Sequence, residues 1–222
     1  MSLTTKGALI VVSGFSGAGK GTLMKNLMKN YGESYALSIS ATSRAPRPGE
    51  EDGREYFFVT RERFEEMIAQ SELVEYAQYV GNYYGTPKAY VMQQLEAGKN
   101  VILEIEIQGA LKIKEQFPEA CLMFVSAPSA TELRNRLVGR GTEAPEVIDQ
   151  RLNRACEESQ GVEAYDYWIV NDDLDATTVR IHNIIENVRN NHSERNAEYT
   201  VSANEGFVNK MRDELMSFSK GE

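Results

Sequence analysis

Residues 14–22 have the composition of a loop that binds phosphate. They lie between an apolar run at 8–14 and an amphipathic stretch at 22–30, and they read Gly14-Phe15-Ser16-Gly17-Ala18-Gly19-Lys20-Gly21-Thr22. Glycines let successive backbone N–H groups converge on phosphate oxygens, and the start of the following helix adds partial positive charge. Lys20 would reach the β- and γ-phosphates, and Thr22 would offer a hydroxyl near the phosphates or magnesium. The segment therefore predicts binding of a nucleoside triphosphate.

The spacing within this loop distinguishes between classes of nucleotide-binding protein. Most such loops have Ser or Thr directly after the lysine, whereas here Gly21 follows Lys20 and Thr22 comes one place later. Kinases of nucleoside monophosphates share this arrangement, and most GTPases do not. A GTPase would also need an Asn-Lys-x-Asp segment to recognise its base, and the chain has none. The sequence therefore disfavours a GTP-driven switch.

Two parts of the chain contain arginine but no lysine. The first part lies between Lys29 and Lys88 and holds Arg44, Arg47, Arg54, Arg61 and Arg63, and the second holds Arg134, Arg136, Arg140, Arg151 and Arg154. In an acidic chain this bias favours planar, bidentate recognition of phosphate. Helix-surface ion pairing is an equal alternative for Arg61, Arg63, Arg134 and Arg154. We expect Arg44, Arg47, Arg140 and Arg151 to bind phosphate.

Short apolar runs that alternate with helical patterns must position these residues. The runs lie at 8–14, 35–40, 101–109, 121–129 and 167–173. Helices are predicted at 88–97, at 129–138 after the capping box Ser129-x-x-Glu132, and at 174–188. This alternation predicts an α/β fold with a mostly parallel sheet.

Two segments depart from the alternation. Residues 55–86 contain short strand-like pieces with a turn at Gly81-Asn82, which predicts a small antiparallel insertion. After about Arg189 the chain is polar, with weak helical periodicity at Phe207, Met211 and Leu215. A docked helix and a loose extension are both compatible with that tail.

Composition excludes several classes of function. The 222 residues carry a net charge of −9, which repels nucleic acids and anionic lipids, so neither is expected as a partner. The longest apolar run, 120–125, is too short to span a membrane, and no signal peptide is evident. The 2 cysteines are expected to be reduced thiols in the cytoplasm, and the 2 histidines leave little for histidine-based catalysis. One large domain, or a core with small appended modules, is expected from the length.

Several motifs in order along the chain resemble those of guanylate kinases. Residues 40–50 resemble the family's GMP-phosphate signature and read Ser40-Ala41-Thr42-Ser43-Arg44-Ala45-Pro46-Arg47-Pro48-Gly49-Glu50, followed by Gly53 and Tyr56. The resemblance continues through Glu75-Tyr76-Ala77, Gly81-Asn82-Tyr83-Tyr84-Gly85-Thr86, Gly139-Arg140-Gly141 and Val170-Asn171-Asp172-Asp173. It covers roughly residues 7–188.

The resemblance implies an architecture and an activity. The architecture is a P-loop NTPase core formed by 1–35 and 98–188, with a parallel sheet flanked by helices and a short helical lid at about 136–151. A mixed or antiparallel GMP-binding insertion occupies 36–97, and the polar extension 189–222 has no assigned role. The implied activity is phosphorylation of GMP, and of dGMP, to the diphosphate by ATP with Mg²⁺, in purine nucleotide metabolism.

The resemblance also implies roles for individual residues. GMP would be bound by Ser40, Arg44, Arg47, Tyr56, Glu75, Tyr84, Thr86 and Glu106. ATP would be bound by Gly14, Ser16, Gly17, Ala18, Gly19, Lys20, Gly21, Thr22, Arg136 and Asn171. The catalytic residues would be Lys20, Arg44, Arg140 and Arg151. No direct metal ligand is expected, because magnesium would be held by the ATP phosphates, with Thr22 or Glu104 acting through water.

The carboxylates support guanine as the base. Glu75 could accept the N1–H and N2 amino donors of guanine, and Ser40 or Thr86 could donate to O6. Adenine would leave that carboxylate unpaired. Glu104 and Glu106, where the family often has Asp, are predicted to share one face of a buried strand at 101–109. Two carboxylates there need a cation or a donor at the end of the strand.

Two other functions remain as alternatives. One is a kinase for a different nucleoside monophosphate, which Glu75 and the Ser40 segment disfavour. The other is a peptide-binding scaffold of guanylate-kinase type, which typically loses the lysine and arginines that are present here as Lys20, Arg140 and Arg151. The sequence leaves the oligomeric state open.

Overall fold

A computed structural model describes residues 6–79, 81–139 and 145–219 of the chain. Its main sheet has five parallel strands in the order β2-β7-β1-β8-β9. Their bounds are β1 (Leu9–Gly14), β2 (Tyr35–Leu37), β7 (Asn100–Glu104), β8 (Cys121–Ser126) and β9 (Tyr167–Val170). The predicted α/β fold with a parallel sheet flanked by helices is confirmed.

The main sheet forms the core because its strands are apolar on both faces. Ile10, Val11 and Val12 of β1 have no exposed surface, and β8 is buried along its whole length. The flanking helices are α1 (Lys20–Tyr31), α3 (Lys88–Glu96), α4 (Ile107–Gln116), α5 (Ala130–Gly139), α6 (Pro145–Ser159) and α7 (Leu174–Arg189). Parallel strands that are covered on both faces read as continuous apolar runs, which is the pattern of the sequence.

Three helices begin or end at residues that favour a helix terminus. Helix α3 is followed by Gly98, which adopts a positive φ of 79°. Before α5, Ser129 Oγ accepts the backbone N–H of Glu132 at 3.0 Å, as one half of a capping box. Asp173 caps α7 by accepting from the backbone N–H of Ala176 at 2.8 Å.

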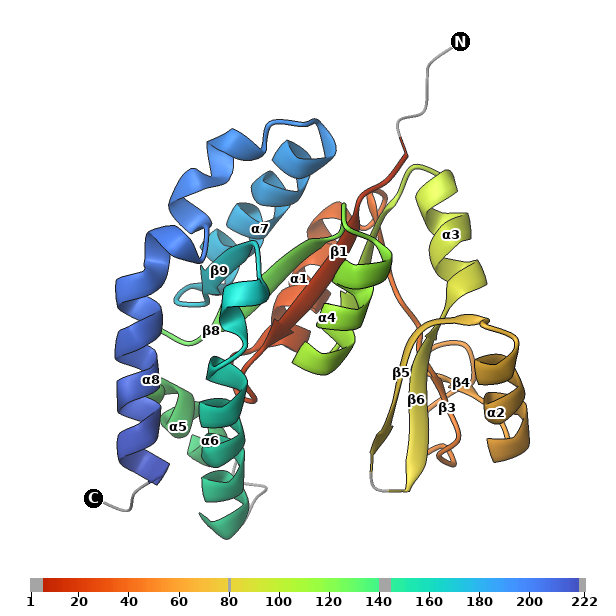
Figure 1. The fold of residues 1–222 in the computed structure, drawn as a ribbon, viewed down its shortest axis with the longest axis horizontal. Helices are drawn as coiled ribbons and strands as arrows, with labels where there is room; N and C mark the ends of the chain where they lie inside the picture. Colours follow the sequence, from red (N-terminus) through yellow and green to blue (C-terminus); the bar gives the residue numbers. More distant parts are fainter. Residues whose placement is uncertain (1–5, 80, 140–144, 220–222) are drawn as a thin grey trace.

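The insertion contains a second sheet of four strands in the order β4-β3-β6-β5. Its strands are β3 (Ala41–Thr42), β4 (Phe57–Phe58), β5 (Leu73–Tyr79) and β6 (Asn82–Pro87). Strands β5 and β6 form an antiparallel hairpin, whereas β3 and β4 are parallel, so the sheet is mixed. Figure 1 shows this sheet with α2 (Arg61–Ala69) on one side of the molecule, away from the C-terminal helix.

The structure corrects the expected strand ends. The run at 35–40 is divided, because β2 ends at Leu37 and the next strand, β3, belongs to the second sheet. The run at 101–109 ends as a strand at Glu104, and α4 begins at Ile107. Glu104 and Glu106 therefore do not share a strand face. Apolar residues continue through both elements, so the pattern alone did not mark the boundary.

Helix α2 is not predicted from the sequence, because it lies within the segment 55–86, whose pattern indicates short strands. Thr60 caps it by accepting the backbone N–H of Arg63, and Phe64 and Met67 on one face are buried. Charged residues occupy most of its remaining positions. Two buried residues three positions apart form too short a pattern to indicate a helix in the sequence.

The C-terminal segment is docked in its described part. Two short 3₁₀ helices (Ser193–Tyr199 and Ser202–Asn204) lead into α8 (Glu205–Ser219). Met211 and Leu215 of α8 are buried in the core, and Figure 1 shows α8 running beside α5 and α6. Arg212 donates to the carbonyl of Ser159 at the end of α6 at 2.6 and 2.9 Å. Of the described helices, none is long and apolar enough to cross a bilayer.

Candidate active site

The phosphate loop connects β1 to α1 and can be built only with glycine at its tightest points. Gly17 and Gly19 have φ values of 92° and 90°, a region that other residues rarely adopt. A Cβ at Gly19 would also lie 2.6 Å from Nδ2 of Asn171. That amide donates to the carbonyl of Ala18 at 2.8 Å. Asn171 therefore lies against the loop, although it follows β9 far along the chain.

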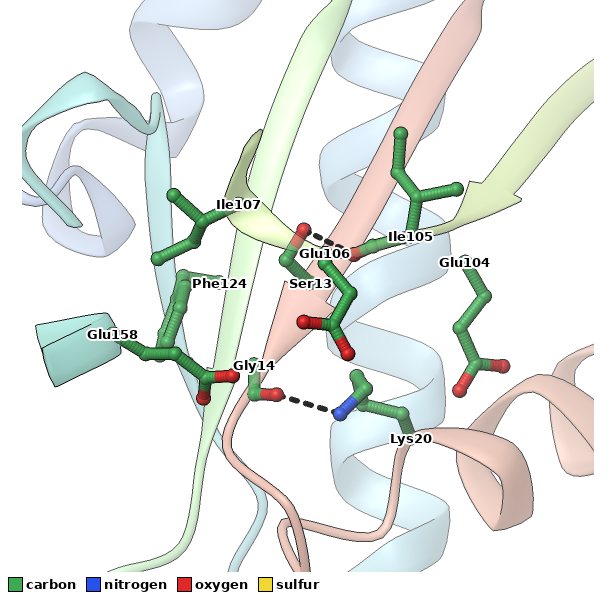
Figure 2. Close-up of a pocket in the computed structure, with 9 residues that line it drawn as sticks. All are labelled: Ser13, Gly14, Lys20, Glu104, Ile105, Glu106, Ile107, Phe124 and Glu158. Carbon is green, nitrogen blue, oxygen red and sulfur yellow. Dashed lines mark hydrogen bonds between the residues drawn. The ribbon is translucent and has the colours of Figure 1, made fainter. Parts of the chain in front are cut away.

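Lys20 is the first residue of α1 and lies within the cradle that the loop forms. Its Nζ donates to the carbonyls of Gly14 and Phe15 at 2.6 and 3.2 Å. The lysine borders a pocket of about 150 Å³, which is shown in Figure 2 and lined by Ser13, Gly14, Lys20, Glu104, Ile105, Glu106, Ile107, Phe124 and Glu158. The pocket thus lies at the carboxyl ends of the central strands.

Three carboxylates line this pocket. Glu104 ends β7, which pairs with β1 in a register that sets Glu104 opposite Val12. Much of the Glu104 side chain contacts solvent, but partial burial of its carboxyl raises its pKa and nearby Lys20 partly opposes that change. Burial, and then repulsion by Glu106, raise the pKa of Glu158. The pocket therefore holds more acidic than basic groups among its lining residues.

Arg136 and Arg151 extend from α5 and α6 toward the phosphate loop. Arg136 Nη2 donates to the carbonyl of Asn171 at 3.0 Å, and its Nε donates to Glu132 at 2.8 Å. Arg151 Nη1 donates to Ser16 Oγ at 2.8 Å. Both guanidinium groups therefore contact residues of the loop or residues beside it. Arg140, the third predicted arginine of this group, lies outside the described residues.

A second cluster forms in the insertion around Arg44. Its guanidinium pairs with Glu50 at 3.0 Å and lies 5.4 Å from the ring centre of Tyr56. The Tyr56 and Tyr84 rings are 6.0 Å apart and nearly perpendicular. The backbone N–H of Arg47 donates to Glu50 Oε2 at 2.7 Å, and this hydrogen bond is the main cause of the lowered Glu50 pKa. Arg44, Arg47, Tyr56 and Tyr84 are thus brought together as predicted residues of one site.

Glu75 and Thr86 face each other on β5 and β6 and are both buried. The Thr86 hydroxyl donates to Glu75 Oε1 at 2.8 Å. The other carboxylate oxygen, Oε2, lies 3.2 Å from the position that a Cβ of Gly109 in α4 would occupy. Burial raises the Glu75 pKa, although the Thr86 hydrogen bond opposes the effect. The Glu75 carboxylate is therefore enclosed and does not face solvent.

Ser40 and Glu106 are also predicted to bind GMP, and their contacts differ from those of Glu75 and Thr86. Ser40 immediately precedes β3, where its carbonyl accepts from the backbone N–H of Phe57 at 2.9 Å. Glu106 occupies the N-cap position of α4 and forms an ion pair with Arg154 of α6. Glu106 lines the pocket of Lys20, while Glu75 lies between β5 and α4. Glu106 thus lines the pocket of Lys20 and pairs with an arginine of α6.

Two acidic residues of these clusters had no role assigned from the sequence. Glu50 ends the arginine motif at 40–50, and Glu158 lies outside the motifs of the sequence. The spacing of Arg151, Arg154 and Glu158 places them on one face of a helix, which is a signal the sequence does contain. Nothing in the sequence indicated that this face would border the loop pocket.

Comparisons with known proteins identify relatives over most of the chain. A model of the guanylate kinase family matches residues 6–188. A guanylate kinase of Halalkalibacterium halodurans is 53% identical over 180 residues, which cover 81% of this chain and 88% of the relative. One from Clostridioides difficile is 52% identical over 185 residues, with coverages of 83% and 90%. A crystal structure of guanylate kinase from Anaplasma phagocytophilum aligns with a TM-score of 0.64 at 35% identity, covering 82% of this chain and 86% of that one.

Proposed function

This chain belongs to the guanylate kinase family, whose members phosphorylate GMP to GDP with ATP, and we propose how its residues carry out that transfer. ATP binds on the loop at 14–22 and GMP binds on the insertion at 36–97. dGMP is a second acceptor. The observation that carries the acceptor assignment is the buried Glu75 carboxylate with its hydrogen bond from Thr86.

ATP is bound by the backbone N–H groups of the loop residues and by Lys20. Lys20 contacts the carbonyls of Gly14 and Phe15 within the loop, so its ammonium is already held beside the place where phosphates bind. Arg136 and Arg151 reach the same loop from α5 and α6. Together with Arg140, they neutralise the charge of the transferring phosphoryl group. Asn171 contacts the loop at Ala18 and lies beside the adenine.

Mg²⁺ accompanies ATP, and the oxygen-bearing residues of the site fit it. Glu104 places a carboxylate at the end of β7, which is the neighbour of β1 in the sheet, and Thr22 lies in the first turn of α1. Mg²⁺ prefers hard oxygen ligands and is usually held by one or two carboxylates, waters and substrate phosphates. When bound, it neutralises charge on the phosphates. Glu104 and Thr22 would hold its water ligands.

The GMP phosphate is bound by Arg44, Arg47, Tyr56 and Tyr84. The ion pair with Glu50 and the neighbouring Tyr56 ring hold the Arg44 guanidinium in place before the ligand arrives. Preorganised guanidinium groups recognise phosphate through paired, charge-assisted hydrogen bonds. Arg44 also acts in catalysis because it fixes the phosphate that attacks ATP.

Guanine is recognised by Glu75, Thr86 and Ser40. The Glu75 carboxylate accepts the two donors on the pairing edge of guanine, and a hydroxyl of Thr86 or Ser40 donates to O6. Glu106 lines the pocket of Lys20 and pairs with Arg154, so guanine recognition does not include it. A buried carboxylate that finds no donor is costly, so adenine is excluded.

The transfer needs alignment and charge neutralisation but no general base. The attacking phosphate oxygen of GMP is already anionic, so no proton has to be removed from it. Lys20 and the arginines stabilise the charge that spreads over the transferring group. The reaction takes place in the cytoplasm, and the free thiols of Cys121 and Cys156 are compatible with a reducing compartment.

An acceptor panel tests both the reaction and the base assignment. ADP release from ATP and Mg²⁺ is measured with GMP, dGMP, AMP, CMP or UMP as acceptor. We expect turnover with GMP and dGMP only. Turnover with AMP or UMP would contradict the role of Glu75 while leaving the phosphate site intact. If GMP binds but no acceptor is phosphorylated, the scaffold function is correct instead.

A further inference from the structure

Arg154 on α6 connects two of the three carboxylates that line the pocket of Lys20. Its Nη2 forms an ion pair with Glu106 at the start of α4, and its Nε donates to Glu158 Oε1 at 3.2 Å. Burial, and then repulsion by the nearby Glu106, raises the pKa of Glu158. Arg154 thus lies where it offsets a repulsion between two elements that are distant in sequence.

Three carboxylates and one cation, Lys20, line the pocket, and Arg154 adds a second cation beside it. Glu104 and Glu158 both interact electrostatically with Lys20, and Figure 2 shows the carboxylates of Glu104, Glu106 and Glu158 arranged around it. Glu158 is shared between two cations, Arg154 and Lys20. If Arg154 were removed, Lys20 would be the cation to which the pocket carboxylates turn.

Phosphate and these carboxylates compete for the same ammonium group. ATP brings several negative charges to the loop, and each carboxylate that pairs with Lys20 both occupies its donors and repels the incoming phosphates. An arginine that engages two carboxylates at once reduces this competition, because its planar guanidinium offers several donors.

We propose that Arg154 is a positioning residue that holds Glu106 and Glu158 away from Lys20, so that the lysine is available to the phosphates of ATP. Arg154 acts through these carboxylates and does not contact substrate. It lies three residues after Arg151, which contacts Ser16 of the loop, so its ion pair with Glu106 also ties α6 to the start of α4 beside that contact. The proposal rests on the proposed binding of ATP to the loop.

A suppressor experiment distinguishes this role from a general structural one. The variants Arg154→Ala, Arg154→Lys, Glu158→Gln and the double variant Arg154→Ala/Glu158→Gln are compared by steady-state kinetics with ATP and GMP. We expect Arg154→Ala to raise the KM for ATP about fivefold, as for the loss of one partly exposed ion-pair network, with the KM for GMP changed less than about twofold. Arg154→Lys should restore part of the loss.

The double variant gives the decisive result. Because it removes one of the two carboxylates that Arg154 holds, and so restores the net charge around Lys20, we expect the KM for ATP to return to within about twofold of the wild-type value. A double variant that is as impaired as Arg154→Ala, or more so, would overturn the proposal. So would an Arg154→Ala variant with an unchanged KM for ATP.

Arg63 provides a matched control. Its side chain is 43% exposed, against 44% for Arg154, and it also pairs with two glutamates, Glu66 and Glu72. Arg63→Ala should leave both KM values unchanged, and an equal change in this variant would also contradict the proposal. The activity of the wild-type chain distinguishes a failure of the proposed function from a failure of the role of Arg154. If the wild type does not phosphorylate GMP, the proposed function fails, whereas an active wild type with unaffected Arg154 variants refutes only the role of Arg154.

Discussion

Individual residues of the site are held in place by contacts made before any substrate binds. Lys20 donates to carbonyls of its own loop, and Arg44 is paired with Glu50. Each cation therefore has limited freedom to lose when phosphate arrives, which reduces the entropic cost of binding. Glu75 differs from these cations, because its carboxylate is buried, has a raised pKa and accepts a hydrogen bond from the Thr86 hydroxyl.

Lys20→Ala should abolish most turnover while leaving GMP binding nearly intact. We expect kcat to fall by at least about 100-fold, because the variant removes a preorganised positive charge from the transferring phosphoryl group. ADP release measures the chemistry, and calorimetric titration with GMP measures acceptor binding. Lys25→Ala, an exposed lysine of the same helix, is the control. A variant that lost GMP binding but kept the chemistry would contradict the assignment.

Glu75→Gln should weaken recognition of GMP and stabilise the folded chain. We expect kcat/KM for GMP to fall by about 10- to 100-fold, in keeping with the ~1.5–3 kcal/mol of a hydrogen bond to a charged group. Burial raises the Glu75 pKa above its ordinary value of 4.5, so ionisation of this residue costs stability as the pH rises through the raised value. Glutamine carries no such cost, and the Tm at neutral pH should therefore rise.

The same shift predicts how GMP binding depends on pH. Protonated Glu75 cannot accept both donors of guanine, so the affinity for GMP in the wild type should fall as the pH decreases through the raised pKa. Glu75→Gln should lack that dependence. Glu66→Gln on the exposed face of α2 is the control for both measurements. A lower Tm in Glu75→Gln, or an unchanged affinity for GMP, would refute the role of the residue.

At the scale of elements, the site is assembled from the ends of strands and the starts of helices. β1 leads into the loop, β7 ends in Glu104, and β9 is followed by Asn171, which contacts the loop. These contributions meet because parallel strands bring their carboxyl ends to one edge of the sheet. Helices α5 and α6 carry Arg136 and Arg151 to that edge. Helix α8 packs beside both helices and lies beyond the segment matched by the family model.

The packing of α8 should contribute substantially to stability. Leu215 is fully buried, whereas Met216, the next residue, is 36% exposed. We expect Leu215→Ala to lower the free energy of unfolding by about 2–5 kcal/mol, and Met216→Ala to change it by less than about 1 kcal/mol. Urea titration measures both. Equal effects of the two substitutions would show that α8 is not packed as described.

At the scale of the whole molecule, the two sheets carry different parts of the site. The parallel sheet carries the nucleotide loop, and the mixed sheet of the insertion carries Arg44, Tyr84, Glu75 and Thr86. Helix α4 touches both parts, since it begins beside the pocket and its Gly109 lies next to Glu75. A ligand that binds between α4 and the insertion should therefore stabilise the chain as a unit.

GMP should raise the stability of the protein more than AMP does. At a concentration of about 100 times its Kd, a ligand that binds only the folded state contributes about 2.7 kcal/mol. Thermal unfolding with GMP, with AMP and without nucleotide measures the difference. We expect a higher Tm with GMP and little change with AMP. Equal stabilisation by the two nucleotides would mean that the base is not recognised through Glu75.

Much of the architecture follows from the sequence alone. The apolar runs predicted the parallel strands, and the Gly-rich segment at 14–22 predicted a loop between a strand and a helix. The periodicity of 174–188 predicted α7 almost to its observed end. These features are local, because glycine conformation, side-chain periodicity and helix capping act over a few residues. Arginine in place of lysine likewise predicted that Arg44, Arg47, Arg140 and Arg151 bind phosphate, and these roles stay predictions.

Tertiary structure alone decided which charges face one another. The sequence did not indicate that β7 ends at Glu104, that Glu106 pairs with Arg154, or that Glu158 reaches the pocket of Lys20. It also left open whether α8 would dock. Contacts between residues so far apart in the chain depend on how helices pack against the sheet. Packing is set by the shapes of many side chains together, whereas the spacing of residues within one segment specifies only its own conformation and exposed face.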